Sequence, residues 1–598
     1  MSGPSPEQRN IIKDTSRIRI VRAAPGSGKT WLVGQIIKKE LETWNKPGGI
    51  AALSFTRVGG EEIRNAVGYE LGLPHFVGTL DSFLFRYIIK PFLSKCYKCK
   101  EPRLIPASYG SEFWTSNIIK YKTKGISGKF VMYNLLDIDF GKCENGEIKL
   151  LYSFQGKEKQ EVPWQHRADI IKKKMIIWQT YGWVSHSDVH FLAYKILDSN
   201  FGHNVISEIE RRFPFIIVDE LQDTGYYICE FLKLLLSKSR IRALLVGDPN
   251  QSIYEFNGAT PEMFDTFKDL KGANDIHLLE SRRCPRKIIK IANIISPDSS
   301  QLTTLKSEDG KAIMLCYNEK DFANEVNFAI NDIYNTSQKK IIKVIARNTS
   351  TLNELKNHCG EKEVKSIGSP VLTHITRGVQ YFLFNQNAKA LSQISDAISL
   401  LLFHEEGFCE DDIIAHNIDP YLWKELICQI LLSCAKEKIN QVTYKEWQEK
   451  AKQDILYILN NKEPFKQYIN EDILKSLKPQ NREGSSDQVS LFLQIPQKNS
   501  DIPLLTVHGV KGETHDTTIF VCPPRRHKYH CPSDAWWNGE EQRIAYVAFT
   551  RSRENLYLLV SKTTAQNLKE NHRDFYDCFE VKNIKDEGSE MSDGDELF

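Results

Sequence analysis

The sequence predicts an α/β protein built on a doubly wound parallel sheet, and three segments carry this prediction. The strand-like run RIRIV at 17–21 leads directly into a glycine-rich loop and a helix-like segment. The run FIIV at 215–218 is fully apolar and ends on two acidic residues, and ALLVG at 243–247 also ends on polar residues. Because ligands of open parallel sheets bind at the carboxyl ends of the strands, these three ends are expected to meet at one site.

The glycine-rich loop AAPGSGKT at 23–30 is expected to bind the phosphates of a nucleotide, because it opens a helix-like segment, WLVGQIIKKEL. Its glycines allow backbone amides to wrap the phosphates, and the helix N-terminus adds positive potential. Lys29 is expected to reach the β- and γ-phosphates, and Thr30 to hold Mg²⁺. The residues expected to contact the nucleotide here are Ala24, Pro25, Gly26, Ser27, Gly28, Lys29 and Thr30.

The segment FPFIIVDELQDT at 213–224 supplies two carboxylates. Its four apolar residues are typical of a parallel strand that is buried on both faces. The strand ends on Asp219 and Glu220, beside the expected phosphate loop. Asp219 is suited to organise Mg²⁺, and Glu220 to accept a proton from the attacking water. An acidic surface turn is the alternative, but such a turn would not need the buried run.

Two later segments supply arginines. LLESRRCP at 278–285 contains Arg282 and Arg283, and EEQRIAYVAFTRSRENLYLLV at 540–560 places Arg551 just before another strand-like run. Two distant arginines of this kind suit stabilisation of charge on a γ-phosphate, each acting as an arginine finger within the same chain. Taken alone, either would be interpreted as a surface cation.

The segment VHGVKGETHD at 507–516 allows two interpretations. His508, Glu513, His515 and Asp516 are all possible ligands of a metal ion. Alternatively, this is a loop between two strands that handles a phosphate or a nucleic acid. The residues of this segment alone do not decide between the two.

Length and composition indicate a large globular protein. With 598 residues the chain is too long for one core, and about 100–200 residues per domain suggests about four domains. A hydrophobic content of 41% and a charged content of 26% are ordinary for soluble proteins. The N-terminus shows no signal-peptide pattern, and no apolar run has transmembrane length, so no membrane association is expected. Thirteen scattered cysteines without a secretion signal favour reduced thiols in the cytoplasm.

The net charge of +3 is unevenly distributed. Residues 586–598 hold six acids and no base, so the rest of the chain carries +9. A moderately basic body suits a polyanionic partner. The acidic end is interpreted as a disordered or solubilising tail.

Taken together and in order, these segments resemble the helicases of superfamily 1A, the UvrD/Rep/PcrA group. The resemblance implies two RecA-like lobes, 1A and 2A, each with a mostly helical insertion, 1B and 2B. It also implies ATP- and Mg²⁺-dependent movement along single-stranded DNA in the 3′ to 5′ direction. The match spans residues 5–560 and runs through SPEQRNII, AAPGSGKT, ALSFTR, VGTLDSF, VDELQDT, VGDPNQSIYEFNGA, LESRRCP, VIARNTS, TVHGVKGE and YVAFTRSRENL.

The resemblance implies the following domain bounds: 1–90 and 205–280 for lobe 1A, 91–204 for insertion 1B, 281–385 and 500–565 for lobe 2A, 386–499 for insertion 2B, and 566–598 for a C-terminal segment with the acidic tail. In 2B, ISDAISLLL and ELICQILLSC are typical of amphipathic helices, and REGSSD at 482–487 of a loop. In 1B, KYKTK and KKK suit either phosphate contacts or a solvated face. The pair Cys96 and Cys99 is half of a zinc-binding pattern or simply an exposed pair.

The resemblance also assigns residues at the nucleotide. Gln8 matches the glutamine that recognises the adenine edge, and Gln251 the residue that lies against the γ-phosphate. The family's adenine is held between an arginine and an aromatic ring, whose positions hold Trp31 and Arg282 here. The two partners appear exchanged, which would keep a cation and a π-surface on opposite faces of the base; alternatively, Trp31 belongs to the core of its helix. Glu513 stands near the family's ribose-contacting glutamate, but directly after Lys-Gly, where a hydrophobic residue is usual.

For DNA, the resemblance implies a track of aromatic residues on which bases stack, worth about 1–3 kcal/mol per base. It gives His508 to DNA, which favours the nucleic-acid interpretation of its segment over the metal site. Asp81 stands where a histidine is common, and Arg57 where an asparagine is common. The residues expected to contact DNA are Phe55, Thr56, Arg57, Thr79, Asp81, Tyr254, Phe256 and His508.

The sequence therefore predicts an ATP-dependent helicase or translocase acting on single-stranded and tailed duplex DNA. Too little chain follows residue 560 for a nuclease domain, so any DNA cleavage is expected to need another protein. Together with the KGETHD variant, this resembles UvrD-like helicases found beside OLD-family (TOPRIM) nucleases in Gabija-type antiphage defence. A role in repair or replication is the alternative. A further alternative is a regulatory NTPase that senses nucleotide or DNA and controls a partner nuclease without processive unwinding.

Overall fold

The computed structural model describes residues 3–584 apart from internal gaps. Contacts divide the chain into two compact units, one of Met1–Ile105, Ile118–Leu355 and Ile502–Phe598, and one of Pro106–Asn117 and Lys356–Asp501. Phe256, the expected loop at 482–487 and the acidic tail lie outside the described residues. The internal gaps are 70, 106–119, 125–129, 143–147, 153–159, 256–257, 299–300, 337–340, 359–368, 384–386, 404–412, 414–415, 417, 437–441, 470–476, 478–502 and 525–531.

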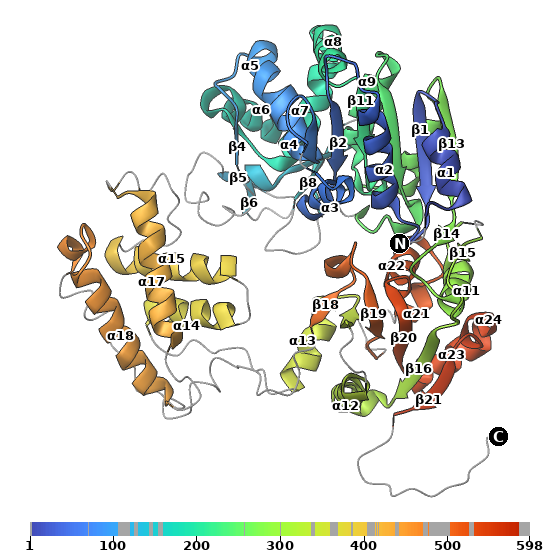
Figure 1. Cartoon of the computed structure of the whole chain (residues 1–598). Helices are drawn as coiled ribbons and strands as arrows, with labels where there is room; N and C mark the ends of the chain where they lie inside the picture. The colour runs from blue at the N-terminus through green and yellow to red at the C-terminus, as the bar shows by residue number, and fades with distance from the viewer. Residues whose placement is uncertain are drawn as a thin grey trace, which may run out of the picture. The chain divides into compact units, whose positions relative to one another are not determined.

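The first unit contains a six-stranded sheet in the order β13-β1-β12-β11-β2-β3, and every pair in it is parallel. In Figure 1 its strands come from distant parts of the chain, with blue β1 and β2 beside strands drawn in green. The strands are β1 Ile18–Ala23, β2 Ile50–Ser54, β3 Phe76–Thr79, β11 Phe215–Val218, β12 Arg242–Gly247 and β13 Ala273–Leu278.

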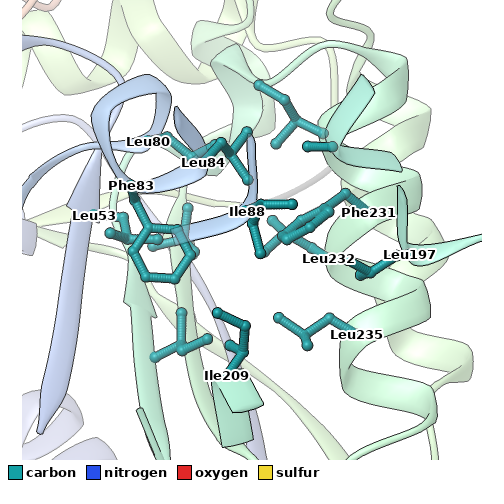
Figure 2. Packing of buried hydrophobic residues seen from close by; sticks show 14 of the residues in the cluster. Leu53, Leu80, Phe83, Leu84, Ile88, Leu197, Ile209, Phe231, Leu232 and Leu235 are labelled. Carbon is teal, nitrogen blue, oxygen red and sulfur yellow. The ribbon is translucent and has the colours of Figure 1, made fainter. Parts of the chain in front are cut away.

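Both faces of this sheet are buried, which explains why its strands are continuous apolar runs. Successive side chains of a strand point to opposite faces, and in β11 Ile216 and Val218 join one hydrophobic cluster while Phe215 and Ile217 join another. Figure 2 shows the first cluster, where Leu53 of β2 packs with side chains from several helices. The surrounding helices are α1 Pro6–Lys13, α2 Lys29–Glu42, α3 Arg57–Val67, α4 Leu80–Leu84, α8 Gly202–Arg212, α9 Tyr226–Ser237 and α10 Pro261–Asp265.

The segment between β3 and α8 combines helices with small antiparallel sheets. A π-helical turn, Phe85–Ile89, continues into α5 Lys90–Tyr97, and the long helix α6 Trp164–Tyr181 precedes α7 His186–Leu197. Strands β5 Lys120–Lys124 and β6 Phe130–Asn134 form one hairpin-like pair. Strands β7 Asp139–Lys142, β8 Ile148–Tyr152 and β9 Gln160–Glu161 form a second antiparallel sheet. The expected helices are therefore accompanied by strands that the sequence had not indicated.

A second six-stranded parallel sheet, in the order β18-β17-β19-β20-β16-β21, also belongs to the first unit. In Figure 1 green β16 lies beside red β20 and β21. Its faces are covered by α11 Arg286–Ile295 and α22 Gly539–Phe549 in one cluster and by α12 Phe322–Thr336 in the other. The strands are β16 Lys311–Tyr317, β17 Ile342–Ala346, β18 Leu504–Thr506, β19 His515–Val521, β20 Ser552–Ser561 and β21 Glu580–Asn583.

These two parallel sheets confirm the predicted α/β fold class. Strand β21 lies within the range 566–598 that the sequence had assigned to a separate C-terminal segment, so part of that range extends the second sheet. The predicted bounds of the four regions stay a prediction.

The second unit is helical where it is described. Its helices are α14 Pro370–Leu383, α15 Asn387–Phe403, α17 Pro420–Lys436 and α18 Tyr444–Asn460. Trp423 and Trp447 are fully buried in the hydrophobic cluster that its described helices form. Helix α14 contributes to this cluster, although the sequence had placed 281–385 in lobe 2A. Across the described helices of both units, none is long and apolar enough to cross a membrane.

Candidate nucleotide and DNA site

The glycine-rich loop follows β1 and opens α2, as the sequence predicts. Gly26 and Gly28 have φ values of 70° and 84°, in the left-handed region that favours glycine. A Cβ atom at Gly26 would lie only 2.3 Å from the Cβ of Arg283. Because Arg283 precedes the second sheet, the loop lies directly against the second lobe.

The carboxylates at the end of β11 lie beside this loop. Thr30 Oγ1 donates to Asp219 Oδ2 at 3.4 Å, and only 2% of Asp219 is exposed. Glu220 adopts a left-handed backbone conformation with φ of 56°, and its carboxylate accepts from Gln222 Nε2 at 2.5 Å. The loop and the carboxylate pair thus form one site, as expected from their strand ends.

The two carboxyls have different proton affinities. Burial and the neighbouring charge of Glu220 raise the pKa of Asp219 to about 7. Burial alone would also raise the pKa of Glu220, but Lys29 and Lys511 lower it below its usual value. Glu220 is therefore ionised at neutral pH, which a proton acceptor requires, whereas Lys29 only partly offsets the effects of burial and of Glu220 on the pKa of Asp219.

Two arginines reach this site from the second lobe. Arg551 is 1% exposed, and its Nη2 donates to Gln251 Oε1 at 2.8 Å. Arg283 Nη1 donates to the Thr550 carbonyl at 3.3 Å. Burial and the nearby Arg283 lower the pKa of Arg551 to about 10, so it remains a cation at neutral pH.

A cavity of about 340 Å³ brings these groups together. Sequence reasoning had not selected Glu62, Thr514 or Arg553. Arg553 stands two residues after Arg551, at the start of β20, and this nearness to a predicted site residue is the signal that could have indicated it. The lining residues are Gly26, Gly28, Lys29, Thr30, Trp31, Glu62, Glu220, Gln251, Arg282, Arg283, Gly512, Thr514, Arg551 and Arg553.

At one end of the cavity, the Arg282 guanidinium lies 5.8 Å from the Trp31 ring centroid. Arg282 Nη2 also donates to Gln8 Oε1 at 2.8 Å, and Gln8 Nε2 donates to the Ser27 carbonyl at 3.0 Å. Trp31 packs against the core of the first lobe and lines the cavity as well. The guanidinium of Arg282 and the ring of Trp31 are thus adjacent. Their role in holding the adenine base stays a prediction.

Glu513 points to other partners. Its Oε2 lies 3.3 Å from His515 Nε2 and 3.9 Å from Lys343 Nζ. Thr514, one residue later, lines the cavity instead. Glu513, which directly follows Lys-Gly, is therefore not among the residues that line the cavity. Its contact with a ribose stays a prediction.

The remaining polar groups of 507–516 have separate partners. His508 Nε2 donates to the Ile253 carbonyl at 2.9 Å, and Asp516 Oδ2 accepts from the Ile341 amide at 3.0 Å. Lys511 forms an ion pair with Asp223. Within the described part of the chain, no three His, Cys, Asp or Glu side chains are arranged to hold a metal ion.

Aromatic side chains lie in a row next to the nucleotide site. The ring of Tyr254 is 5.8 Å from that of Phe55 and 5.8 Å from that of His508. Thr56 caps α3 by accepting from the Gly59 amide at 3.0 Å. A second cavity of about 810 Å³ is lined by four residues expected at DNA, Phe55, Arg57, Thr79 and Asp81. Phe256 lies outside the described residues.

Two parallel-sheet lobes that share a phosphate loop, a carboxylate pair and arginines define the two-lobed class of P-loop proteins. The chain belongs to the UvrD/Rep helicase family: residues 4–271 match the UvrD/REP helicase N-terminal domain, and residues 430–563 match the UvrD-like helicase C-terminal domain.

Three relatives illustrate the similarity. Gabija protein GajB from Bacillus cereus (strain VD045) is 26% identical over 307 residues, which cover 50% of this chain and 51% of that protein. The ATP-dependent DNA helicase PcrA from Bacillus subtilis is 26% identical over 363 residues, 57% of this chain and 46% of PcrA. A probable DNA helicase II homolog from Mycoplasma genitalium is 21% identical over 633 residues, 92% and 84% of the two chains. The chain thus spans about half the length of the first two relatives.

Proposed function

We propose that this protein is an ATP-dependent DNA helicase or translocase that moves 3′ to 5′ on single-stranded DNA in the cytoplasm. The observation that carries this proposal is the hydrogen bond from Arg551 of the second lobe to Gln251 of the first lobe. Both residues line the same cavity as Glu220. Groups for hydrolysis are contributed by both lobes, so their relative movement would control turnover. Membership of the UvrD/Rep family supports the same function.

In this proposal the chain's own residues perform the chemistry of ATP hydrolysis. The loop amides and Lys29 bind the phosphates. Gln251 orients the attacking water, and ionised Glu220 accepts its proton. Arg283 and Arg551 stabilise the charge that develops on the γ-phosphate.

A divalent cation fits the carboxylate pair. Thr30 and Asp219 would hold Mg²⁺, since hydroxyl and carboxylate oxygens are its preferred ligands. The hydrogen bond from Thr30 Oγ1 to the buried Asp219 carboxyl supports this assignment, because it holds the two oxygen ligands side by side. Bound there, Mg²⁺ would neutralise charge on the phosphates.

The proposed DNA track begins three residues after Gln251. Tyr254 would offer its ring to a base, next to Phe55 and His508. A short segment therefore joins the water-positioning residue to the stacking residue, which would allow hydrolysis to move a base. The proposed substrates are single-stranded and tailed duplex DNA.

A second candidate function is a regulatory NTPase that senses DNA or nucleotide and controls a separate nuclease, of the OLD-family (TOPRIM) type. The similarity to Gabija protein GajB supports a role in antiphage defence, in which this candidate would act. Co-purification with the product of a neighbouring nuclease gene would support it.

The first test is the rate of ATP hydrolysis by the purified full chain, with and without single-stranded DNA. The wild type is expected to hydrolyse ATP faster with DNA. Lys29→Ala is expected to lose hydrolysis and to bind ATP weakly, because the phosphates lose their cation. Glu220→Gln is expected to bind ATP but not to turn it over. Undiminished hydrolysis in either variant would refute this assignment of the site.

A further inference from the structure

Asp81 and His186 line the second cavity, and Asp81 also contacts the imidazole of His190. His186 Nδ1 lies 2.7 Å from Asp81 Oδ2, and His190 Nε2 lies 2.6 Å from Asp81 Oδ1. Asp81 belongs to α4, whereas His186 and His190 stand four residues apart on one face of α7. The side chains of Asp81, His186 and His190 are 29%, 41% and 27% exposed. Asp81 and His186 are accessible from the cavity.

The hydrogen bonds fix the position of the protons. Burial alone would raise the pKa of the Asp81 carboxyl, but His190 and His186 hold it far below its usual value. An ionised carboxylate only accepts hydrogen bonds. Nδ1 of His186 therefore donates to Asp81. A neutral imidazole has a single N–H, so Nε2 of neutral His186 carries a lone pair, and only the protonated ring can donate from both nitrogens.

The surroundings of His186 are mainly cationic. Three arginines and a second histidine line the same cavity, against one further acid. Asp81 adds a negative charge, but both of its oxygens accept from imidazoles. The other charged and titratable groups that line the cavity are Asp81 on α4, Arg86 on the π-helical turn, Arg57, Glu61 and Arg64 on α3, and His75 before β3. The neighbouring elements add His190 on α7 itself, the Lys174–Asp188 pair between α6 and α7, Asp139 bonded to Ser187, and the Glu230–Lys233 pair of α9.

We propose that His186, positioned by Asp81, binds a backbone phosphate of single-stranded DNA in its protonated form, so that DNA binding takes up a proton. This inference rests on the proposed DNA-binding function and names a residue of its phosphate site. A phosphate needs a donor, which neutral Nε2 cannot supply and protonated Nε2 supplies together with a positive charge. Asp81 is then a positioning residue. This role explains why an acidic residue stands among the residues expected to contact DNA, which is itself negatively charged.

The experiment measures the binding of fluorescein-labelled oligo(dT) by fluorescence anisotropy, without nucleotide and at fixed salt, from pH 6 to pH 8.5. Imidazole titrates near pH 6.5, so the affinity of the wild type is expected to fall as pH rises, by at most about tenfold per pH unit for one proton. His186→Gln is expected to bind weakly at pH 6 and to lose the pH dependence. His203→Gln, at an exposed position on α8 outside the cavity, serves as the matched control and should keep the wild-type profile.

Two more variants separate charge from structure. His186→Lys carries a permanent charge and is expected to bind at pH 8 as tightly as at pH 6. Asp81→Asn is expected to weaken binding at pH 6, because the His186 imidazole loses the carboxylate that positions it. Each of these results supports the proposal, and a purely structural histidine would not give the pH-independent binding of His186→Lys.

A pH-independent affinity of the wild type, or a His186→Gln variant that keeps the wild-type dependence, would overturn the inference and leave the proposed function intact. A wild type that binds no single-stranded DNA at any pH would instead contradict the DNA-binding function itself. The two failures are therefore distinguishable in one titration series.

Discussion

At the scale of single residues, Lys511 contacts both the segment proposed to position the attacking water and the ring proposed to stack on a base. Its Nζ forms an ion pair with Asp223, donates to the Gln251 carbonyl at 2.7 Å and lies 4.7 Å from the Tyr254 ring centroid. Lys511→Met is expected to bring the DNA-stimulated rate of ATP hydrolysis close to the rate without DNA, because the link between the stacking residue and the water-positioning segment is lost. The measurement is the ratio of the two rates.

A matched control is needed because the Lys511–Asp223 pair is buried, with side chains 8% and 4% exposed. Removing one partner of a buried pair costs about 3–5 kcal/mol, so Lys511→Met should also unfold at a lower temperature. Lys511→Met combined with Asp223→Asn removes both charges and should recover much of the stability without recovering stimulation. If stimulation returns together with stability, Lys511 has only a structural role.

Trp31 gives a second residue-scale prediction. If its ring stacks on the base, Trp31→Ala should raise the KM for ATP more than it lowers kcat, because stacking holds the ground state and the transition state alike. Trp31→Phe keeps a ring and should remain close to the wild type. Steady-state kinetics decide the question, and a change confined to the unfolding temperature would assign Trp31 to the core.

Residues that follow a strand directly could be predicted, whereas residues brought in by packing could not. Asp219 and Glu220 directly follow the apolar strand β11, and Lys29 stands where the glycine-rich loop after β1 enters α2. The structure places the three in one site. Glu62 lines the same cavity from α3, but nothing in its local sequence marks that face of the helix. The imidazoles at Asp81 come from α7, more than a hundred positions along the chain, and no local pattern links them to Asp81.

At the scale of elements, the phosphate loop can be tested by two glycines with the same backbone conformation. Gly26 and Gly68 both have positive φ, of 70° and 76°. A Cβ at Gly26 would meet the Cβ of Arg283 at 2.3 Å, whereas at Gly68 the nearest atom is the flexible end of Lys38 at 3.8 Å. Gly26→Ala is therefore expected to lose most ATP hydrolysis, because loop and arginine are forced apart.

Gly68→Ala is the control for backbone strain alone and is expected to lose about 1 kcal/mol of stability with nearly normal hydrolysis. Equal loss of hydrolysis in the two variants would show that strain, and not the contact with Arg283, is responsible. Hydrolysis rates and unfolding temperatures of both variants give the comparison.

The elements themselves differ in how well sequence patterns predict them. Strands such as β11 and β12 are buried on both faces, so their apolar runs are unambiguous. The strands β5 to β9 are short and antiparallel, and β5 reads KYKTK, which equally suits a solvated loop. Their formation depends on pairing with partners elsewhere in the chain, which a local pattern does not contain.

At the scale of the whole molecule, turnover is expected to depend on the second lobe. Arg283→Ala and Arg551→Ala should each lower the DNA-stimulated rate of hydrolysis strongly, by about 10³–10⁵ as for other finger arginines. Arg553→Ala removes another arginine from the same cavity, one whose side chain is 52% exposed, and is the matched control. Normal hydrolysis in both finger variants with DNA present would show that the second lobe does not control the chemistry.

The choice between a motor and a sensor also belongs to the whole molecule, and strand displacement decides it. In a motor, the short segment from Gln251 to Tyr254 converts each hydrolysis event into movement of a base, so a duplex with a 3′ tail should be unwound faster than one with a 5′ tail. A sensor needs DNA binding but no directional step, so its hydrolysis should respond equally to both tails without displacement. The assay is run at low salt, where phosphate contacts are strongest, with Lys29→Ala as the control without hydrolysis. Stimulated hydrolysis without displacement on either substrate would contradict the motor and favour the regulatory NTPase.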